Sequence, residues 1–264
     1  MSLILLLLAG LLLPAMAQTS GPPANAPSYS AASIVNTASD TPNWFTPNAF
    51  VAIFGTNLAY TTVGLAASDT ASGTLPTILT GTNLRVIVNG LAAYIYYVSP
   101  GMVNVLLPAG LTAGPATIQL ELDGIAGPLV AINLLAVAPV VVTADGTAVW
   151  GVHGNGALIT PTSPAMPGES IFLFASGLGQ TNPPQGSGIV PAYASQLQNL
   201  AGFAVWINGS QLDPSNVGYA GILPGNAGVY EIVVTLPTPL PHDPEIRMSA
   251  GGVMSLPQTI LSTQ

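Results

Sequence analysis

The chain has 264 residues, of which 49% are hydrophobic and only 5% are charged, and its formal net charge is −8 at pH 7. It contains no Lys and only two Arg, so it lacks the cations that neutralise phosphates, and we expect it to bind no nucleic acid. The lack of Lys and Cys also excludes Schiff-base catalysis, P-loop phosphate sites, thiol catalysis and thiolate metal ligands. We therefore expect no cofactor.

The N-terminus carries an apolar run that is typical of an export signal. Residues 1–17 end in Ala15-Met16-Ala17, and the small residues at both ends of this triplet predict signal-peptide cleavage after Ala17. Residues 18–29 are rich in Pro, Ser and Ala and are expected to form a flexible leader. We expect a secreted protein, either extracellular or held at the cell surface, with the periplasm as the alternative location.

A second apolar run, without any charge, covers residues 124–144 and is long enough to cross a bilayer. Pro128 and Pro139 interrupt this run, Asn133 lies in its middle, and no basic residue flanks it. We interpret the run as a strand, a linker and a further strand. No transmembrane span is expected in the mature chain.

The mature chain contains two copies of one unit. Four blocks of the first half align in order with four blocks of the second half: 51–58 with 171–178, 85–90 with 204–209, 103–108 with 232–237, and 118–124 with 246–252. The spacing grows in the second copy, which predicts a longer loop at 212–228. We expect a first repeat at 30–138 and a second at 139–264.

Each copy reads as a series of short strands. Apolar, β-branched runs alternate with turn residues, and Asn89-Gly90 and Asn208-Gly209 are strong hairpin signals. Helical stretches between the strands are missing, which argues against an α/β fold. The sequence therefore predicts an all-β fold of two tandem immunoglobulin-like β-sandwich domains.

Four segments carry motifs of one known family: 33–39 (SIVNTAS), 50–59 (FVAIFGTNLA), 98–104 (VSPGMVN) and 175–183 (ASGLGQTNP). The chain, from residue 30 onward, resembles the Solibacter-type uncharacterised C-terminal domain family of secreted bacterial proteins. The resemblance implies tandem immunoglobulin-like or TIG-like sandwich units and supplies no catalytic residues. The chain departs from the family at Met102, where the family has Gln, and the family's domain usually ends a longer protein.

The ionisable residues suggest no active site. His153 and His242 lie in segments rich in Gly or Pro, and no G-x-S-x-G nucleophile motif occurs, so we expect loop histidines. Glu121 and Asp123 are two residues apart on a predicted strand and are interpreted as a solvated strand face. We expect no catalytic or metal site, although an interdomain calcium ion at Asp145 stays open as an alternative.

Aromatic residues are the remaining candidates for ligand binding. Tyr94 and Tyr96 alternate along one predicted strand, Trp44 precedes a strand, and Tyr219 lies in the predicted long loop of the second copy. Exposed rings of this kind stack on sugars. The alternative interpretation is that these rings fill cores or cover domain edges.

The favoured hypothesis is an exported, non-enzymatic module of structural or adhesive type. A second hypothesis is a module that binds carbohydrate or cell-wall matrix through the aromatics, and a third is a hydrolase with an unrecognised site. The expected partners are other extracellular proteins or polysaccharide, and the sequence does not determine the oligomeric state.

Overall fold

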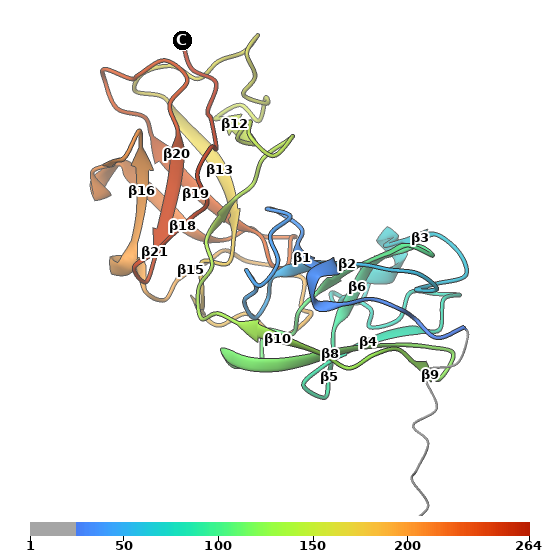
Figure 1. Cartoon of the computed structure of the whole chain (residues 1–264). Coiled ribbons are helices and arrows are strands. Elements are labelled where there is room, and N and C mark those ends of the chain that lie inside the picture. Colours follow the sequence, from blue (N-terminus) through green and yellow to red (C-terminus); the bar gives the residue numbers. More distant parts are fainter. Residues whose placement is uncertain (1–24) are drawn as a thin grey trace, which may run out of the picture.

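A computed structural model describes residues 25–264, and their regular secondary structure consists almost entirely of β-strands joined by turns and loops (Figure 1). The predicted signal peptide and the leader up to residue 24 lie outside the described residues. Within residues 25–264 the helical elements are four short 3₁₀ turns: η1 (Ala31–Ser33), η2 (Ala67–Thr70), η3 (Leu200–Gly202) and η4 (Pro214–Asn216). The predicted all-β class is confirmed. No helix in this part of the chain has the length and hydrophobicity needed to span a membrane.

The first repeat contains two antiparallel sheets. One has the order β1 (Ile34–Asn36), β2 (Phe50–Phe54), β7 (Met102–Leu106), β6 (Tyr94–Val98), β3 (Val63–Gly64). The other has the order β10 (Val130–Leu134), β8 (Gly114–Leu122), β4 (Leu84–Val88), β5 (Leu91–Ala92), with β9 (Ile125–Ala126) also paired to β8. Alternate residues of both sheets meet in one buried apolar cluster, as a sandwich requires.

The second repeat is built in the same way. Its larger sheet has the order β11 (Val140–Val141), β13 (Ser170–Ser176), β19 (Tyr230–Thr235), β18 (Val217–Ile222), β15 (Ser195–Leu197), β14 (Thr181–Asn182), and β12 (Gly151–His153) also pairs with β13. Its smaller sheet has the order β17 (Ser210–Gln211), β16 (Phe203–Ile207), β20 (Ile246–Ala250), β21 (Val253–Met254). A second apolar cluster lies between these two sheets.

The four aligned sequence blocks occupy matching places in the two repeats. Strand β2 pairs with β7 as β13 pairs with β19, and β4 pairs with β8 as β16 pairs with β20. The alignment therefore identifies two adjacent interior strands of each sheet. Tandem sandwich domains are thus visible both in the sequence and in the strand pairing.

The Asn-Gly hairpins form, but they are shorter than the sequence suggests. Asn89 and Gly90 both have positive φ, at 47° and 80°, as a type I′ turn requires. Only Leu91 and Ala92 then pair with β4, and the chain crosses to the other sheet as β6. The apolar run from 92 to 98 therefore does not form one strand. It is divided at the buried Ala93, where the chain passes from one sheet to the other.

The predicted long loop at 212–228 contains a strand. Strand β18 pairs with β19 along its length, with a bulge between Val217 and Tyr219. The expectation of a loop was wrong because Gly218 and Gly221 interrupt the pattern that would mark a strand. The long excursion of the second repeat lies elsewhere, at residues 183–194 between β14 and β15. We call residues 183–194 the arm.

The arm joins the two repeats. Its residue Ile189 forms an antiparallel bridge with Thr74, with Leu75 N donating to Gly188 O at 2.7 Å and Val190 N donating to Gly73 O at 2.9 Å. A third apolar cluster lies here and contains side chains of both repeats: Phe50, Leu65, Leu75, Tyr94, Tyr96, Leu106, Val190 and Ala227. The two repeats therefore share an apolar interface in addition to the linker.

The linker itself is held by backbone contact. Ala138 N donates to Gly177 O at 2.8 Å, and a Cβ on Gly177 would overlap the backbone of Ala138. Gly177 also has a φ of +71°, which a residue with a side chain rarely adopts. The start of the second repeat is thereby fixed against the end of β13.

The arm gives a test of the interface. A Cβ on Gly188 would overlap the ring of Tyr94, and Gly188 has a φ of +67°. Gly188→Val is expected to lower the free energy of unfolding by about 2 kcal/mol and to expose the arm to thermolysin. Gly64→Ala, where a Cβ meets nothing within 4 Å, serves as the matched control in urea unfolding and proteolysis. Equal proteolysis rates for the two variants would contradict the assignment.

Candidate functional site

Two of the four predicted ligand-binding aromatics lie in the interface between the repeats. Tyr94 and Tyr96 are both half-buried and pack against the third apolar cluster. The ring of Tyr96 meets Phe50 edge to face, with ring centroids 4.6 Å apart. Burial raises the pKa of the Tyr96 hydroxyl to about 12. These rings already pack against protein, which corresponds to the alternative interpretation that they cover a domain edge.

A bulge changes which side the tyrosines face. The register of β6 against β7 shifts between Ile95 and Tyr97, so Tyr97 lies opposite Asn104. Asn104 alternates with core residues of β7 and faces away from the core, so Tyr97 lies on the outer face with it. Regular alternation would place Tyr97 on the same face as the buried Ile95, and the bulge places it on the opposite face.

The other two predicted aromatics are also held by protein contacts. The indole nitrogen of Trp44 donates to the carbonyl oxygen of Pro139 at 3.4 Å, which places this side chain on the linker. The Tyr219 hydroxyl lies 2.9 Å from Ile222 O and 3.3 Å from Ser195 O. Burial raises the pKa of the Tyr219 hydroxyl. The four predicted aromatics therefore do not come together in one site.

The aromatics that the structure exposes are different ones. Tyr193 at the end of the arm is 85% exposed, Tyr60 is 64% exposed, and Trp150 is 46% exposed. Tyr193 lies between Pro191 and Ser195 in a segment without a strand pattern. This loop composition is the sequence feature from which the exposure of Tyr193 could have been predicted.

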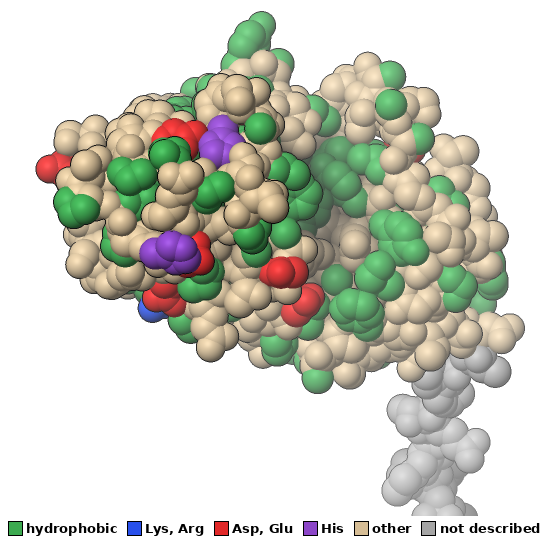
Figure 2. Space-filling model, turned by 90° about the horizontal axis from the view of Figure 1, so that it is seen from above, with side chains coloured by type: hydrophobic (Ala, Val, Ile, Leu, Met, Phe, Trp, Pro, Cys, Tyr) green, Lys and Arg blue, Asp and Glu red, His purple; other side chains and the backbone are tan. Residues whose placement is uncertain are grey.

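The ionisable side chains are few and do not gather in one place. Figure 2 shows the acidic side chains scattered on a largely uncharged surface. Glu121 lies opposite Arg85 across β4 and β8. Asp145 accepts hydrogen bonds from the backbone N–H of Ala148 and Thr147, which lower the pKa of its carboxyl. His153 is not an isolated loop histidine, because its Nδ1 lies 2.6 Å from Glu169 Oε1. Residues 25–264 contain no group of three or more His, Cys, Asp or Glu able to hold a metal ion.

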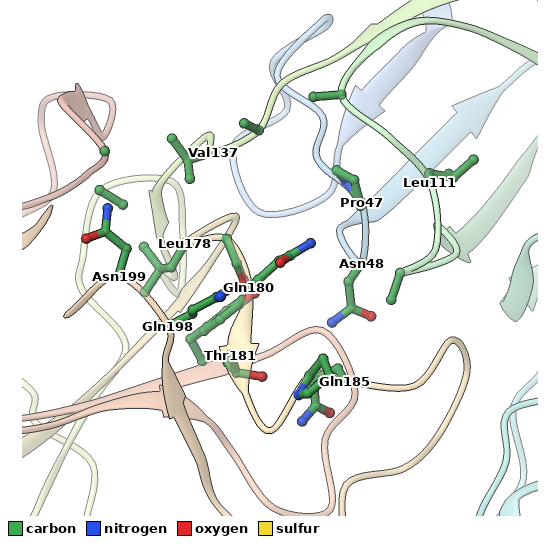
Figure 3. Close-up of a pocket in the computed structure, with 18 of the residues that line it drawn as sticks. Pro47, Asn48, Leu111, Val137, Leu178, Gln180, Thr181, Gln185, Gln198 and Asn199 are labelled. Carbon is green, nitrogen blue, oxygen red and sulfur yellow. The ribbon is translucent and has the colours of Figure 1, made fainter.

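A cavity with a volume of about 380 Å³ lies between the two repeats. Pocket volumes of roughly 300–1,000 Å³ are typical of sites for small ligands. Its walls come from the loops after β1 and β7, the linker, the ends of β13, β14 and β15, the start of the arm, and the ends of β19 and β20. Figure 3 shows Pro47, Asn48 and Leu111 on one side and Gln180, Gln198 and Asn199 on the other. We call this cavity the interdomain pocket.

Carboxamide side chains dominate the polar part of the interdomain pocket. Five of them line it: Asn48, Gln180, Gln185, Gln198 and Asn199. Gln198 N donates to Gln180 O at 2.8 Å, and residues opposite each other on paired strands share a face, so their side chains lie together. Asn199 is engaged through Oδ1 with Gly202 N, while the other four amides form no side-chain hydrogen bond within residues 25–264. Each free amide offers two N–H donors and one carbonyl acceptor.

The rest of the interdomain pocket is apolar and uncharged. Leu111, Val137 and Leu178 supply aliphatic surface. Tyr230 is buried, its hydroxyl donates to Gly179 O, and burial strongly raises the pKa of that hydroxyl. No acidic, basic or His side chain is among the described residues that line the pocket. The arrangement can bind a neutral ligand that exchanges many hydrogen bonds, and it lacks groups for proton transfer.

The interdomain pocket could not be predicted from the sequence because its residues come from seven separate segments of the chain: 47–48, 109–113, 136–137, 178–185, 198–199, 230 and 250–251. Isolated Gln and Asn residues in loops have the same appearance as ordinary turn residues. The one available signal was the density of amides around β14 and β15, at Gln180, Gln185, Gln196 and Gln198.

No protein-family model matches the chain, and no curated protein matches it. Among solved structures, a surface glycan-binding protein (SGBP-B) of Bacteroides ovatus, in complex with a mixed-linkage heptasaccharide, is 13% identical, with 92% of this chain and 47% of that chain covered and a TM-score of 0.34. A surface glycan-binding protein of Prevotella bryantii is 11% identical, with 84% and 39% covered and a TM-score of 0.27. The tandem Ig repeats of Dlar are 11% identical, with 90% and 95% covered and a TM-score of 0.22. The chain spans less than half the length of the two glycan-binding structures.

The buried position of Tyr96 predicts a structural role. Tyr96→Ala is expected to lower the free energy of unfolding by about 2–3 kcal/mol, because it removes a ring from the interface. Tyr193→Ala, at an 85% exposed position, is expected to change the free energy of unfolding by less than about 0.5 kcal/mol. Urea unfolding of both variants measures the difference, and equal stabilities would contradict the structural role.

The buried tyrosines also predict a loss of stability at alkaline pH. Burial raises the pKa of Tyr29 and of Tyr96 to about 12, whereas an unfolded tyrosine titrates near 10. As the pH rises from about 10 to 12, the unfolded state loses these protons first, so the free energy of unfolding falls. Tyr96→Phe is expected to reduce this fall, measured by urea unfolding at pH 9 and pH 11. An unchanged fall in that variant would show that Tyr96 does not contribute.

Proposed function

We propose that the protein is an exported β-sandwich module of adhesive type that binds neutral carbohydrate in the interdomain pocket. The observation that carries this proposal is the set of unpaired amides on an uncharged cavity of about 380 Å³. Amide groups both donate and accept, as the hydroxyl groups of a sugar do. Export rests on the predicted signal peptide.

The neutrality of the interdomain pocket selects the class of carbohydrate. An anionic polysaccharide would bring carboxylates or sulfates to a chain with a net charge of −8 and to a pocket without a cation. A neutral sugar instead places its C–H faces on Leu111, Val137 and Leu178 and its hydroxyls on the amides. The low charge of the pocket therefore favours glucan-like or mannan-like ligands.

The interdomain pocket is proposed as a binding site and not as an active site. Glycoside hydrolysis needs a pair of carboxylates beside the scissile bond, and the described lining residues include none. The proposed contacting groups are the amides of the pocket. They take the place of the four aromatics that the sequence suggests for the same ligand class: Trp44, Tyr94, Tyr96 and Tyr219.

Affinity electrophoresis of the mature chain through gels containing neutral polysaccharides tests the proposal. Retardation is expected in at least one neutral polysaccharide and not in polygalacturonate. Gln198→Ala and Asn48→Ala are each expected to weaken binding by up to about tenfold, the effect of one lost hydrogen bond of roughly 1 kcal/mol. Gln211→Ala makes the same chemical change on the exposed strand β17 and is the matched control.

Two outcomes would contradict the proposal. Free migration in every neutral gel would remove carbohydrate binding and leave the structural or adhesive hypothesis alone. Retardation that is lost in Tyr193→Ala or Trp150→Ala but kept in Gln198→Ala would move the binding surface from the interdomain pocket to the exposed aromatics.

A further inference from the structure

Three side chains that belong to no common sequence motif meet on the outer edge of the second repeat. His153 ends strand β12, Ser163 closes the tight turn that begins at Thr160, and Glu169 precedes strand β13. His153 Nδ1 lies 2.6 Å from Glu169 Oε1, and His153 Nε2 lies 3.3 Å from Ser163 Oγ. Ser163 is exposed in a shallow depression that the other two side chains also line.

The carboxylate fixes the orientation of the imidazole. Glu169 Oε2 accepts a hydrogen bond from Met166 N at 2.9 Å, which leaves Oε1 directed at the ring. Both side chains are largely covered, with 13% of the His153 side chain and 22% of the Glu169 side chain exposed. The carboxylate holds the ring proton on Nδ1, so in the neutral ring the lone pair of Nε2 faces the serine hydroxyl.

The backbone beside Nε2 suits the charged form of the ring. The carbonyl oxygen of Ser163 lies 3.1 Å from Nε2 and accepts from Thr160 N through its other lone pair. Once Nε2 has taken up a proton, it can donate to this oxygen. An imidazolium formed by proton transfer from Ser163 is therefore stabilised by Glu169 on one side and by this carbonyl on the other.

We propose that Ser163, His153 and Glu169 form a Ser-His-Glu catalytic triad that hydrolyses small carboxylic esters. Ser163 is the nucleophile, His153 is the general base, and Glu169 is the positioning residue for the imidazole. This site is separate from the interdomain pocket and shares no lining residue with it. An exposed, shallow depression fits an acyl group that projects from a larger molecule, such as an acetyl ester on a polysaccharide.

The reaction balances as an ordinary acyl transfer. Ser163 Oγ forms a bond to the carbonyl carbon of the ester while its proton passes to His153 Nε2. The bond from that carbon to the alcohol oxygen then breaks, and the departing alcohol takes the proton from His153. Water repeats the sequence on the acyl-serine, releasing the carboxylic acid and restoring the hydroxyl. No metal or redox partner is needed.

Asn155 provides the donor for the oxyanion. Its Oδ1 accepts from Ala157 N at 2.9 Å, and its NH₂ group donates to no protein atom in the described part of the chain. Asn155 lines the same depression as Ser163 and His153. An amide N–H in this position stabilises the negative charge that develops on the carbonyl oxygen.

Labelling of the full chain with a fluorophosphonate probe tests the triad. The probe is expected to add once, at Ser163, and the site is read by peptide mass spectrometry. His153→Asn is expected to slow the labelling by about 100-fold, the lower end of what a general base contributes. Ser170→Ala, which removes the other serine lining this depression, is the matched control and is expected to label normally.

Each result has a defined meaning. No adduct at Ser163, or an equal labelling rate in His153→Asn, overturns the triad. Hydrolysis of p-nitrophenyl acetate that is lost in Ser163→Ala and kept in Ser170→Ala supports it. Hydrolysis that persists in Ser163→Ala places any esterase activity elsewhere and also overturns it.

Glu169 is tested by a pH profile. The hydrogen bond that His153 donates to Glu169 raises the pKa of the imidazole above its ordinary value. Glu169 is the other titratable side chain among the described residues that line the depression. The labelling rate should rise with pH as the ring becomes neutral. In Glu169→Gln the labelling rate is expected to rise at lower pH and to reach a lower plateau. A pH profile of the labelling rate whose midpoint does not move in this variant would overturn the role of Glu169.

Discussion

The apolar contact between the two repeats is the interaction on which the rest of the molecule depends. The sheet of β1, β2, β7, β6 and β3 presents aromatic and aliphatic side chains outward, and the arm covers them. Without this cover, the first repeat would expose a contiguous apolar face to water, which soluble domains avoid. The same contact fixes the walls of the interdomain pocket, because Asn48 and Gln180 come from different repeats. Binding at this pocket therefore requires the interface to be formed.

The scarcity of charge shapes both proposed sites. In the interdomain pocket, a ligand can contact only polar neutral groups and aliphatic surface, because no charged side chain is among the described residues that line it. On the outer edge of the second repeat, His153 and Glu169 form the shorter and more buried of the two His–carboxylate pairs found among residues 25–264. A short hydrogen bond of this kind orients an imidazole without help from further charges.

Much of the fold could be predicted from the sequence. The four aligned blocks correspond to the central strands of the sheets, because buried strands keep their apolar alternation in both repeats. The sites could not be predicted in this way. Tyr94 and Tyr96 have the pattern of an exposed strand face, and only the arm, more than 85 positions later in the chain, decides that they are covered. His153 and Ser163 are brought together by two adjacent turns whose composition alone indicates loops.

The arm also determines which proteases can cut the folded protein. A protease that cuts after basic residues finds only Arg85 and Arg247 in the entire chain, and both lie within paired strands. Enzymes that cut after aromatic residues instead find Tyr193, which is 85% exposed at the end of the arm. A single cut there would divide the segment that covers the first repeat while leaving both sandwich cores intact. The lifetime of the folded protein in the presence of proteases thus depends on which residue type those proteases cut after.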